Sequence, residues 1–178
     1  MILVRNKREI FKTRYTYLVC FDKDGTLVVD PGYVHNLKDF QWHNNGLNLL
    51  KIASQQNAAI VVITNQSGIS KNIFTKKQSI LFARHLIKKA RKEKISIKLI
   101  IMCPHSDKLN YKICHCRKPS PGMYLKVKSL NWARNLKSIM IGNTETDENF
   151  AINSGIEYLD VDNVYSRELL IDWGNSKL

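Results

Sequence analysis

The fold of this chain can be inferred from residues 15–26, which read Tyr15-Thr16-Tyr17-Leu18-Val19-Cys20-Phe21-Asp22-Lys23-Asp24-Gly25-Thr26. The apolar run up to Phe21 is typical of a strand that is covered on both faces, as in a parallel sheet. Alternation along a strand puts Asp22 and Asp24 on one side of the chain, at the carboxyl end where α/β proteins bind ligands. Two such carboxylates repel each other unless a cation lies between them or they take part in chemistry. A plain polar turn is the alternative interpretation.

The bulk composition indicates one soluble globular domain over residues 1–178, in which residues 1–14 form a basic N-terminal extension. No apolar run approaches the ~20 residues that a membrane helix needs, and the charged first residues do not resemble an export signal. We therefore expect a cytoplasmic protein, and we expect it to be a monomer. The formal net charge of +13 favours anionic partners, which include phosphorylated metabolites and nucleic acid.

Strands and helices are predicted to alternate along the rest of the chain. Further strands are expected at residues 58–63, 97–102, 138–141 and 156–161. Four helices are expected: one around residues 47–53 that ends at Asn57, and a second that begins at a Thr75/Gln78 capping box. A third begins with Ser120 as N-cap and Pro121 as first helical residue, and a fourth runs from about Asp147 to Gly155. This alternation predicts an α/β fold, a Rossmann-like parallel sheet with helices on both faces and no large cap domain.

Polar residues follow four of the predicted strands. They are Asp22 with Asp24, Thr64 with Asn65, Arg117 with Lys118, and Asn143 with Asp147. Because the carboxyl ends of parallel strands share one edge, these groups are expected to meet in space. Their chemistry suits phosphoryl transfer: one carboxylate can be the nucleophile, a second can move the proton, and a hydroxyl and a lysine can neutralise phosphoryl oxygens.

Three of the four cysteines are crowded into one segment. Cys103 and His105 are followed by Cys114 and Cys116, which makes four ligands of the kind that tetrahedral Zn²⁺ prefers. Reduced surface cysteines are the alternative. A closed four-ligand site would be structural, and we expect it to hold Arg117 and Lys118 against the strand ends, with His115 pointing to solvent.

The four polar clusters resemble the motifs of the haloacid dehalogenase superfamily of phosphohydrolases, over about residues 15–162. The resemblance implies that Asp22 is the nucleophile, Asp24 the general acid and base, and that Thr64 and Lys118 hold the phosphoryl group. It also implies that catalytic Mg²⁺ is bound by Asp22, by the Asp24 main-chain carbonyl and by the residue at position 143.

Position 143 departs from the superfamily pattern, which has Asp where this chain has Asn143. An amide oxygen can coordinate Mg²⁺ but brings no charge, and Asp147, Glu145 or a water are candidates to compensate.

The zinc-loop residues and the Arg117-Lys118-Pro119-Ser120-Pro121-Gly122-Met123 run are similar to those of the D-glycero-D-manno-heptose 1,7-bisphosphate phosphatases. Histidinol-phosphate phosphatases share the catalytic and zinc motifs but usually have a shorter zinc loop. The resemblance implies a substrate-binding set of Asp30, Gly32, Tyr33, Asn65, Gln66, Ser67, Arg117 and Thr144.

We therefore expect a Mg²⁺-dependent phosphatase that removes the C7 phosphate of a small phosphorylated sugar in nucleotide-heptose synthesis. The alternatives are a histidinol-phosphate phosphatase, a nucleic-acid 3′-phosphatase, and a phosphate-binding protein weakened in catalysis at Asn143. Residues 76–94 carry many lysines and arginines, and we interpret them as a solvated face rather than a polyanion site. No membrane partner is expected, and nucleic acid is not the preferred one.

Overall fold

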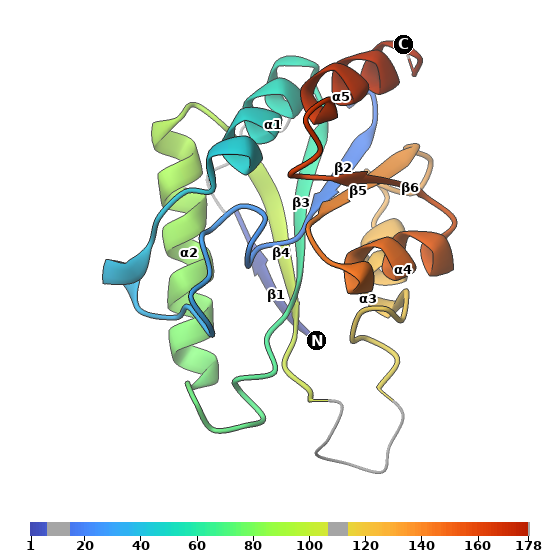
Figure 1. Ribbon diagram of the computed structural model, residues 1–178. Coiled ribbons are helices and arrows are strands. Elements are labelled where there is room, and N and C mark those ends of the chain that lie inside the picture. The colour runs from blue at the N-terminus through green and yellow to red at the C-terminus, as the bar shows by residue number, and fades with distance from the viewer. Residues whose placement is uncertain (7–14, 107–113, 178) are drawn as a thin grey trace.

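The computed structural model describes residues 1–6, 15–106 and 114–177 (Figure 1). Its strands are β1 (Ile2–Arg5), β2 (Leu18–Phe21), β3 (Ala59–Asn65), β4 (Ile97–Cys103), β5 (Ser138–Gly142) and β6 (Glu157–Asp160). They form one six-stranded sheet in the order β1-β4-β3-β2-β5-β6. Every neighbouring pair is parallel except β1 with β4, so the predicted parallel sheet is confirmed and gains an antiparallel edge strand.

Helices cover both faces of this sheet (Figure 1). They are α1 (Asn44–Gln55), α2 (Lys76–Lys92), α3 (Gly122–Lys128), α4 (Glu145–Ser154) and α5 (Ser166–Asn175). Val19 and Phe21 of β2 pack with buried residues of α1, α2 and α5, while Leu18 and Cys20 pack with those of α3 and α4. All four β2 residues are buried, which explains why that strand is apolar at successive positions and does not alternate.

Local signals in the sequence mark three helix ends correctly. Thr75 and Gln78 form the predicted capping box of α2. Asn57 follows α1 with a φ of 59°, a left-handed conformation that Asn tolerates at a helix end. Gly155 ends α4 in the same way with a φ of 64°. The α4 helix begins at Glu145, before the predicted Asp147, because Thr144 and Asp147 form a capping box of their own.

The predicted start of the third helix is wrong. Pro121, not Ser120, holds the N-cap position of α3, and no side chain caps that end. The Ser120 amide instead donates to the Arg117 carbonyl at 2.8 Å, so Ser120 belongs to the preceding turn. A Cβ on Gly122 would lie 2.0 Å from the His115 carbonyl oxygen. The segment around His115 therefore approaches the start of this helix so closely that only glycine fits at position 122.

Two elements were not assigned from the sequence pattern. The α5 helix packs Leu170 and Trp173 into the core, and the Tyr17 hydroxyl donates to Gln56 close to Gly174 of the same helix. The basic N-terminal extension forms β1 over its first residues, whereas positions 7–14 lie outside the described residues. Within the described ranges, no helix combines the length and the apolar character that a bilayer crossing requires.

Candidate active site

The turn after β2 is fixed by main-chain bonds. The Asp22 amide donates to the Ile141 carbonyl of β5 at 2.9 Å, and the Lys23 carbonyl accepts from the amides of Leu27 and Val28. Gly25 turns the chain with a φ of 78°, a conformation that glycine adopts without strain. The carboxylates of Asp22 and Asp24 are thereby presented at the edge of the sheet where β3, β2 and β5 all end.

Lys118 joins two of the sequence motifs. Its ammonium lies 2.6 Å from Asp22 Oδ1 and 2.5 Å from Asp147 Oδ1, and all three side chains are almost fully buried. The desolvation of Lys118 is outweighed by these two carboxylates, so its pKa is raised. Burial raises the pKa of Asp22 to about 7; Lys118 opposes this shift, while Asp147 and Asp24 add to it.

Asn65 holds the main chain of Lys118 in place. Its amide Nδ2 donates to the Lys118 carbonyl and its Oδ1 accepts from the Lys118 amide, both at 3.0 Å. This two-point clasp joins the end of β3 to the segment that follows the cysteine cluster. It explains how a lysine in an irregular segment is positioned against a strand end 96 residues away in sequence.

Asp147 also caps the N-terminus of α4. Its Oδ2 accepts from the Asn143 amide at 3.3 Å, from the Thr144 amide at 3.2 Å and from the Thr144 hydroxyl at 2.8 Å. A Cβ at Gly142 would lie 2.4 Å from Asp147 Cβ, so only glycine leaves room there. Since both Asp147 oxygens already have partners, the contacts favour a role in orienting Lys118. The Thr144 hydroxyl serves the same cap, and its contact with substrate stays a prediction.

Asn143 lies against the turn after β2. Its Oδ1 accepts a hydrogen bond from the Thr26 hydroxyl at 3.0 Å, and its Nδ2 would lie 2.4 Å from a Cβ placed on Gly25. The ends of β2 and β5 therefore bring an amide oxygen, not a third carboxylate, to the turn that carries Asp22 and Asp24. Oxygen donors of this kind suit Mg²⁺.

Both carboxylate oxygens of Asp24 contact a neighbouring side chain. Gln66 Nε2 donates to Oδ2 at 2.7 Å, and the Lys23 ammonium lies 2.6 Å from Oδ1. Gln66 also donates to the buried Thr64 hydroxyl oxygen at 3.1 Å, so it connects two of the predicted catalytic residues. Burial raises the pKa of Asp24, although Lys23 and Gln66 oppose the shift. A raised pKa favours the protonated carboxyl that a general acid needs.

A cavity of about 230 Å³ opens beside Asp24. Its lining brings together most of the predicted substrate-binding residues with two that were not predicted, and the full set is Asp24, Asp30, Gly32, Tyr33, Val34, Asn65, Gln66, Ser67 and Phe74. Residues 30–34, in the connection between β2 and α1, thus lie beside the end of β3. Asp30 shapes this loop because its Oδ1 accepts from the amides of Gly32 and Val34.

Lys71 is a further residue of this region. Its ammonium lies 2.6 Å from the Tyr33 hydroxyl, a contact that lowers the pKa of Tyr33. Lys71 was not among the site residues predicted from the sequence. Arg117 donates instead to the His105 carbonyl at 3.2 Å, which ties it to the cysteine cluster.

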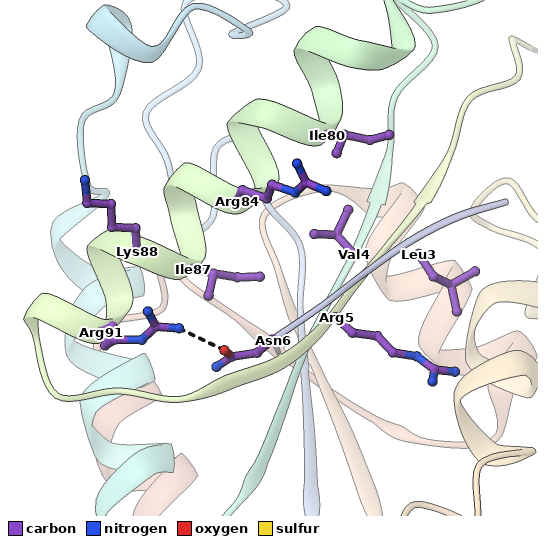
Figure 2. Close-up of a pocket in the computed structure, with 9 residues that line it drawn as sticks. All are labelled: Leu3, Val4, Arg5, Asn6, Ile80, Arg84, Ile87, Lys88 and Arg91. Atoms are coloured by element: carbon purple, nitrogen blue, oxygen red, sulfur yellow. Dashed lines mark hydrogen bonds between the residues drawn. The ribbon is translucent and has the colours of Figure 1, made fainter. Parts of the chain in front are cut away.

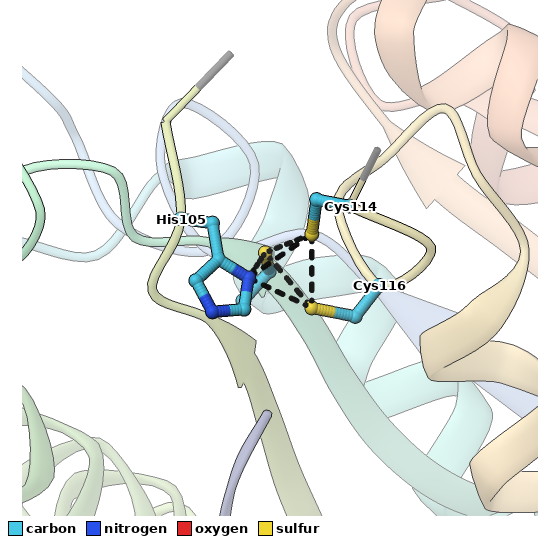
Figure 3. A group of neighbouring side chains, drawn as sticks. His105, Cys114 and Cys116 are labelled. Atoms are coloured by element: carbon cyan, nitrogen blue, oxygen red, sulfur yellow. Dashed lines mark hydrogen bonds between the residues drawn. The ribbon is translucent and has the colours of Figure 1, made fainter. Parts of the chain in front are cut away.

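The predicted zinc ligands form a compact cluster. Figure 3 shows that His105, Cys114 and Cys116 point toward one another, and Cys103 completes the group. The six distances among the three Sγ atoms and His105 Nδ1 lie between 3.0 and 3.6 Å. Ligand atoms about 2.3 Å from a central Zn²⁺ would be about 3.8 Å apart in a regular tetrahedron. The donor set and its shape therefore fit zinc.

The cluster also has the electrostatics of a metal site. Although burial opposes the shift, hydrogen bonds from Cys116 and His105 lower the pKa of Cys114 to about 6, which favours the thiolate that binds metal. All three cysteines are free of disulfide bonds, and His115 is exposed as expected. The interior of the loop, residues 107–113, lies outside the described residues.

A larger cavity of about 690 Å³ lies between β1 and α2, away from these motifs (Figure 2). Four basic side chains, Arg5, Arg84, Lys88 and Arg91, line it together with apolar side chains of both elements. Arg91 is oriented by a hydrogen bond to Asn6 Oδ1 at 2.9 Å.

The sequence and the fold are similar to those of known proteins. The family model described as polynucleotide kinase 3 phosphatase matches residues 17–165. A D-glycero-beta-D-manno-heptose-1,7-bisphosphate 7-phosphatase from Pasteurella multocida is 34% identical over 133 residues, 72% of each chain. A D-glycero-alpha-D-manno-heptose-1,7-bisphosphate 7-phosphatase from Campylobacter jejuni is 30% identical over 157 residues, which are 88% of this chain and 87% of that protein.

Two solved structures share the fold. A protein from Mesorhizobium loti described as HAD-like superposes with a TM-score of 0.83 at 18% identity, over 98% of this chain and 93% of that one. The D,D-heptose 1,7-bisphosphate phosphatase from B. bronchiseptica, solved with magnesium and phosphate, gives a TM-score of 0.71 at 23% identity, over 80% of this chain and 78% of that one.

Proposed function

Because this chain belongs to the polynucleotide kinase 3 phosphatase family, within the haloacid dehalogenase superfamily of phosphatases, we propose that it removes the C7 phosphate of D-glycero-D-manno-heptose 1,7-bisphosphate. The chain is a phosphatase, and the substrate is taken from the names of its relatives. One observation carries the proposal: Asp22, Asp24, Thr64 and Lys118 converge beside a cavity that is lined by the predicted sugar-binding residues.

In the first step, an oxygen of Asp22 attacks phosphorus and the P–O bond to C7 breaks. The bonding electron pair stays on the sugar oxygen, which takes a proton from the Asp24 carboxyl group. Lys118, held by Asp147, and the Thr64 hydroxyl face the phosphoryl oxygens and reduce their charge. The products of this step are the sugar alcohol and an aspartyl-phosphate on Asp22.

In the second step, water attacks phosphorus and Asp24 accepts its proton, while the bond between phosphorus and the Asp22 oxygen breaks. The electron pair of that bond stays on Asp22, which returns to the carboxylate as phosphate is released. Asp22, the Asp24 main-chain carbonyl and the Asn143 side-chain oxygen would hold Mg²⁺. When bound, that ion neutralises charge on the phosphoryl group. The contacts of Asn143 with Thr26 and Gly25 support its place in this set.

We assign a structural Zn²⁺ to Cys103, His105, Cys114 and Cys116. With four protein ligands the metal would have no open position for substrate. Its effect would be to stiffen the segment between β4 and α3, from which Arg117 binds the His105 carbonyl and Lys118 reaches Asp22.

Turnover on defined phosphate esters tests the proposal. The panel contains both anomers of the heptose bisphosphate, histidinol phosphate and 3′-phosphorylated DNA, with Asp22→Asn as the inactive control. We expect one phosphate to be released per heptose bisphosphate, with the C1 phosphate retained. Preferred turnover of histidinol phosphate or of the DNA would overturn the assigned substrate. Phosphate binding without turnover on any ester would point to a binding protein.

A nucleic-acid 3′-phosphate is the second candidate substrate, and the basic cavity between β1 and α2 favours it. The α2 sequence holds seven lysines and arginines and no acidic residue. Phosphate contacts made by such a surface would give steep salt dependence. A KM for 3′-phosphorylated DNA that rises sharply between about 50 and 200 mM salt would support this candidate, and Arg84→Glu with Lys88→Glu should then raise it further.

A further inference from the structure

Lys23, between the two aspartates, has an unusual environment for a lysine. Its side chain is only 3% exposed, and its ammonium lies 4.5 Å from the centre of the Phe82 ring on α2. Lysine is rarely this buried unless it is paired, because removing an ammonium from water is energetically unfavourable. A role for Lys23 must therefore be sought in the groups that its ammonium contacts.

Two contacts of that ammonium connect it to the active site. It lies 2.6 Å from Asp24 Oδ1, and it donates to the Val34 carbonyl at 3.3 Å. Asp24 and Val34 both line the 230 Å³ cavity. Lys23 therefore bridges the general acid and base to the loop over the cavity, while Gln66 holds the other Asp24 oxygen.

We propose that Lys23 is a positioning residue for the reaction: its buried ammonium holds the Asp24 carboxyl group toward the leaving oxygen and couples that orientation to the loop at Val34. This inference rests on the proposed role of Asp24. Without the ammonium, Asp24 keeps one side-chain donor, Gln66, and its carboxyl group can rotate. A general acid that is displaced by even a small distance loses much of its effect.

The choice of leaving group separates positioning from stability. A sugar phosphate leaves as an alkoxide and needs the Asp24 proton, whereas p-nitrophenyl phosphate leaves as a stable phenolate and does not. The ratio of kcat/KM for the two esters reports on the first step, because kcat/KM does not include hydrolysis of the aspartyl-phosphate. We expect Lys23→Met to lower the alkyl-to-aryl ratio by about tenfold or more, and Lys23→Arg to restore most of it.

Two controls make the result specific. Lys98→Met truncates another buried lysine, which contacts the Tyr15 hydroxyl, and it should lower stability without changing the ratio. In an Asp24→Asn background the ratio should already be low, and Lys23→Met should not lower it further, since coupled residues are not additive.

The proposal is overturned if Lys23→Met reduces kcat/KM equally for both esters, or if it lowers the ratio by the same factor with and without Asp24. Glycerol 2-phosphate serves as a second alkyl ester. If the heptose bisphosphate is not a substrate, only the proposed substrate is contradicted. The alkyl-to-aryl ratio measured with glycerol 2-phosphate would still decide the role of Lys23.

Discussion

The burial of Asp22 has a measurable effect on stability in the absence of Mg²⁺. Desolvation raises its pKa from 3.8 to about 7, with Lys118 opposing and Asp147 and Asp24 adding to the shift. Between these two pH values the folded protein binds more protons at this site than the unfolded chain does. Stability from this group is therefore fully present below about pH 3.8 and is lost as the pH rises through about 7.

The size of the effect follows from the shift. Each pKa unit corresponds to about 1.36 kcal/mol, so a shift of roughly three units gives about 4 kcal/mol as an upper value. Asp22→Asn removes the titration and keeps the shape, but it also loses the charge partner of Lys118, which still pairs with Asp147. We expect the free energy of unfolding of Asp22→Asn, relative to that of the wild type, to increase by about 2–3 kcal/mol between pH 5 and pH 8.

Urea unfolding followed by circular dichroism at pH 5, 6, 7 and 8 measures this difference. The buffers contain neither Mg²⁺ nor a chelator, so that any bound zinc stays in place. Asp172→Asn, an exposed position on α5, is the matched control and should follow the wild type. The reasoning is refuted if the stabilities of wild type and Asp22→Asn run parallel over the whole pH range.

Three further outcomes are expected. Protein purified without added zinc should contain about one Zn²⁺ per chain. Cys114→Ser should release this metal and lower the free energy of unfolding by about 3–5 kcal/mol, and zinc-free protein of normal stability would contradict the prediction. Asn143→Asp should lower the Mg²⁺ concentration needed for half-maximal turnover and raise the rate, and identical Mg²⁺ titrations would show that another group is the ligand. Asp147→Ala should lower the free energy of unfolding by about 3 kcal/mol, because it removes the α4 cap and one partner of Lys118. Asp147→Asn should lower it less, because the amide oxygen can still accept a hydrogen bond. Equal losses for the two variants in thermal or urea unfolding would contradict the role of Asp147 as a cap.

The comparison of Lys23 with Asp22 illustrates what a sequence pattern can reveal. A strand of apolar residues that ends in two aspartates predicts both the central strand and a site at its end, because alternation and burial are local properties. Nothing in that pattern distinguishes a solvent-exposed Lys23 from the buried side chain observed. Its position depends on Phe82 and Val34, which come from a helix and a loop elsewhere in the chain.

Asp147 shows the same limit at the other strand end. Its spacing from Asn143 makes it a candidate metal ligand, which stays a prediction, and in the structure its two oxygens contact Lys118 and the start of α4. The choice between these roles depends on Lys118, 29 residues away in sequence, and on the space that Gly142 leaves.

The sequence alone determined the alternation of strands and helices, the polar groups at the strand ends and the grouping of three Cys and one His in one segment. These features follow from residue periodicity and short spacings, which act along the chain. The tertiary structure decided the antiparallel placement of β1, the close approach of His115 to Gly122, and the partners of the buried charges. These depend on contacts between distant segments, where the cost of burying an ion or a backbone group is met only by a partner that folding brings within reach.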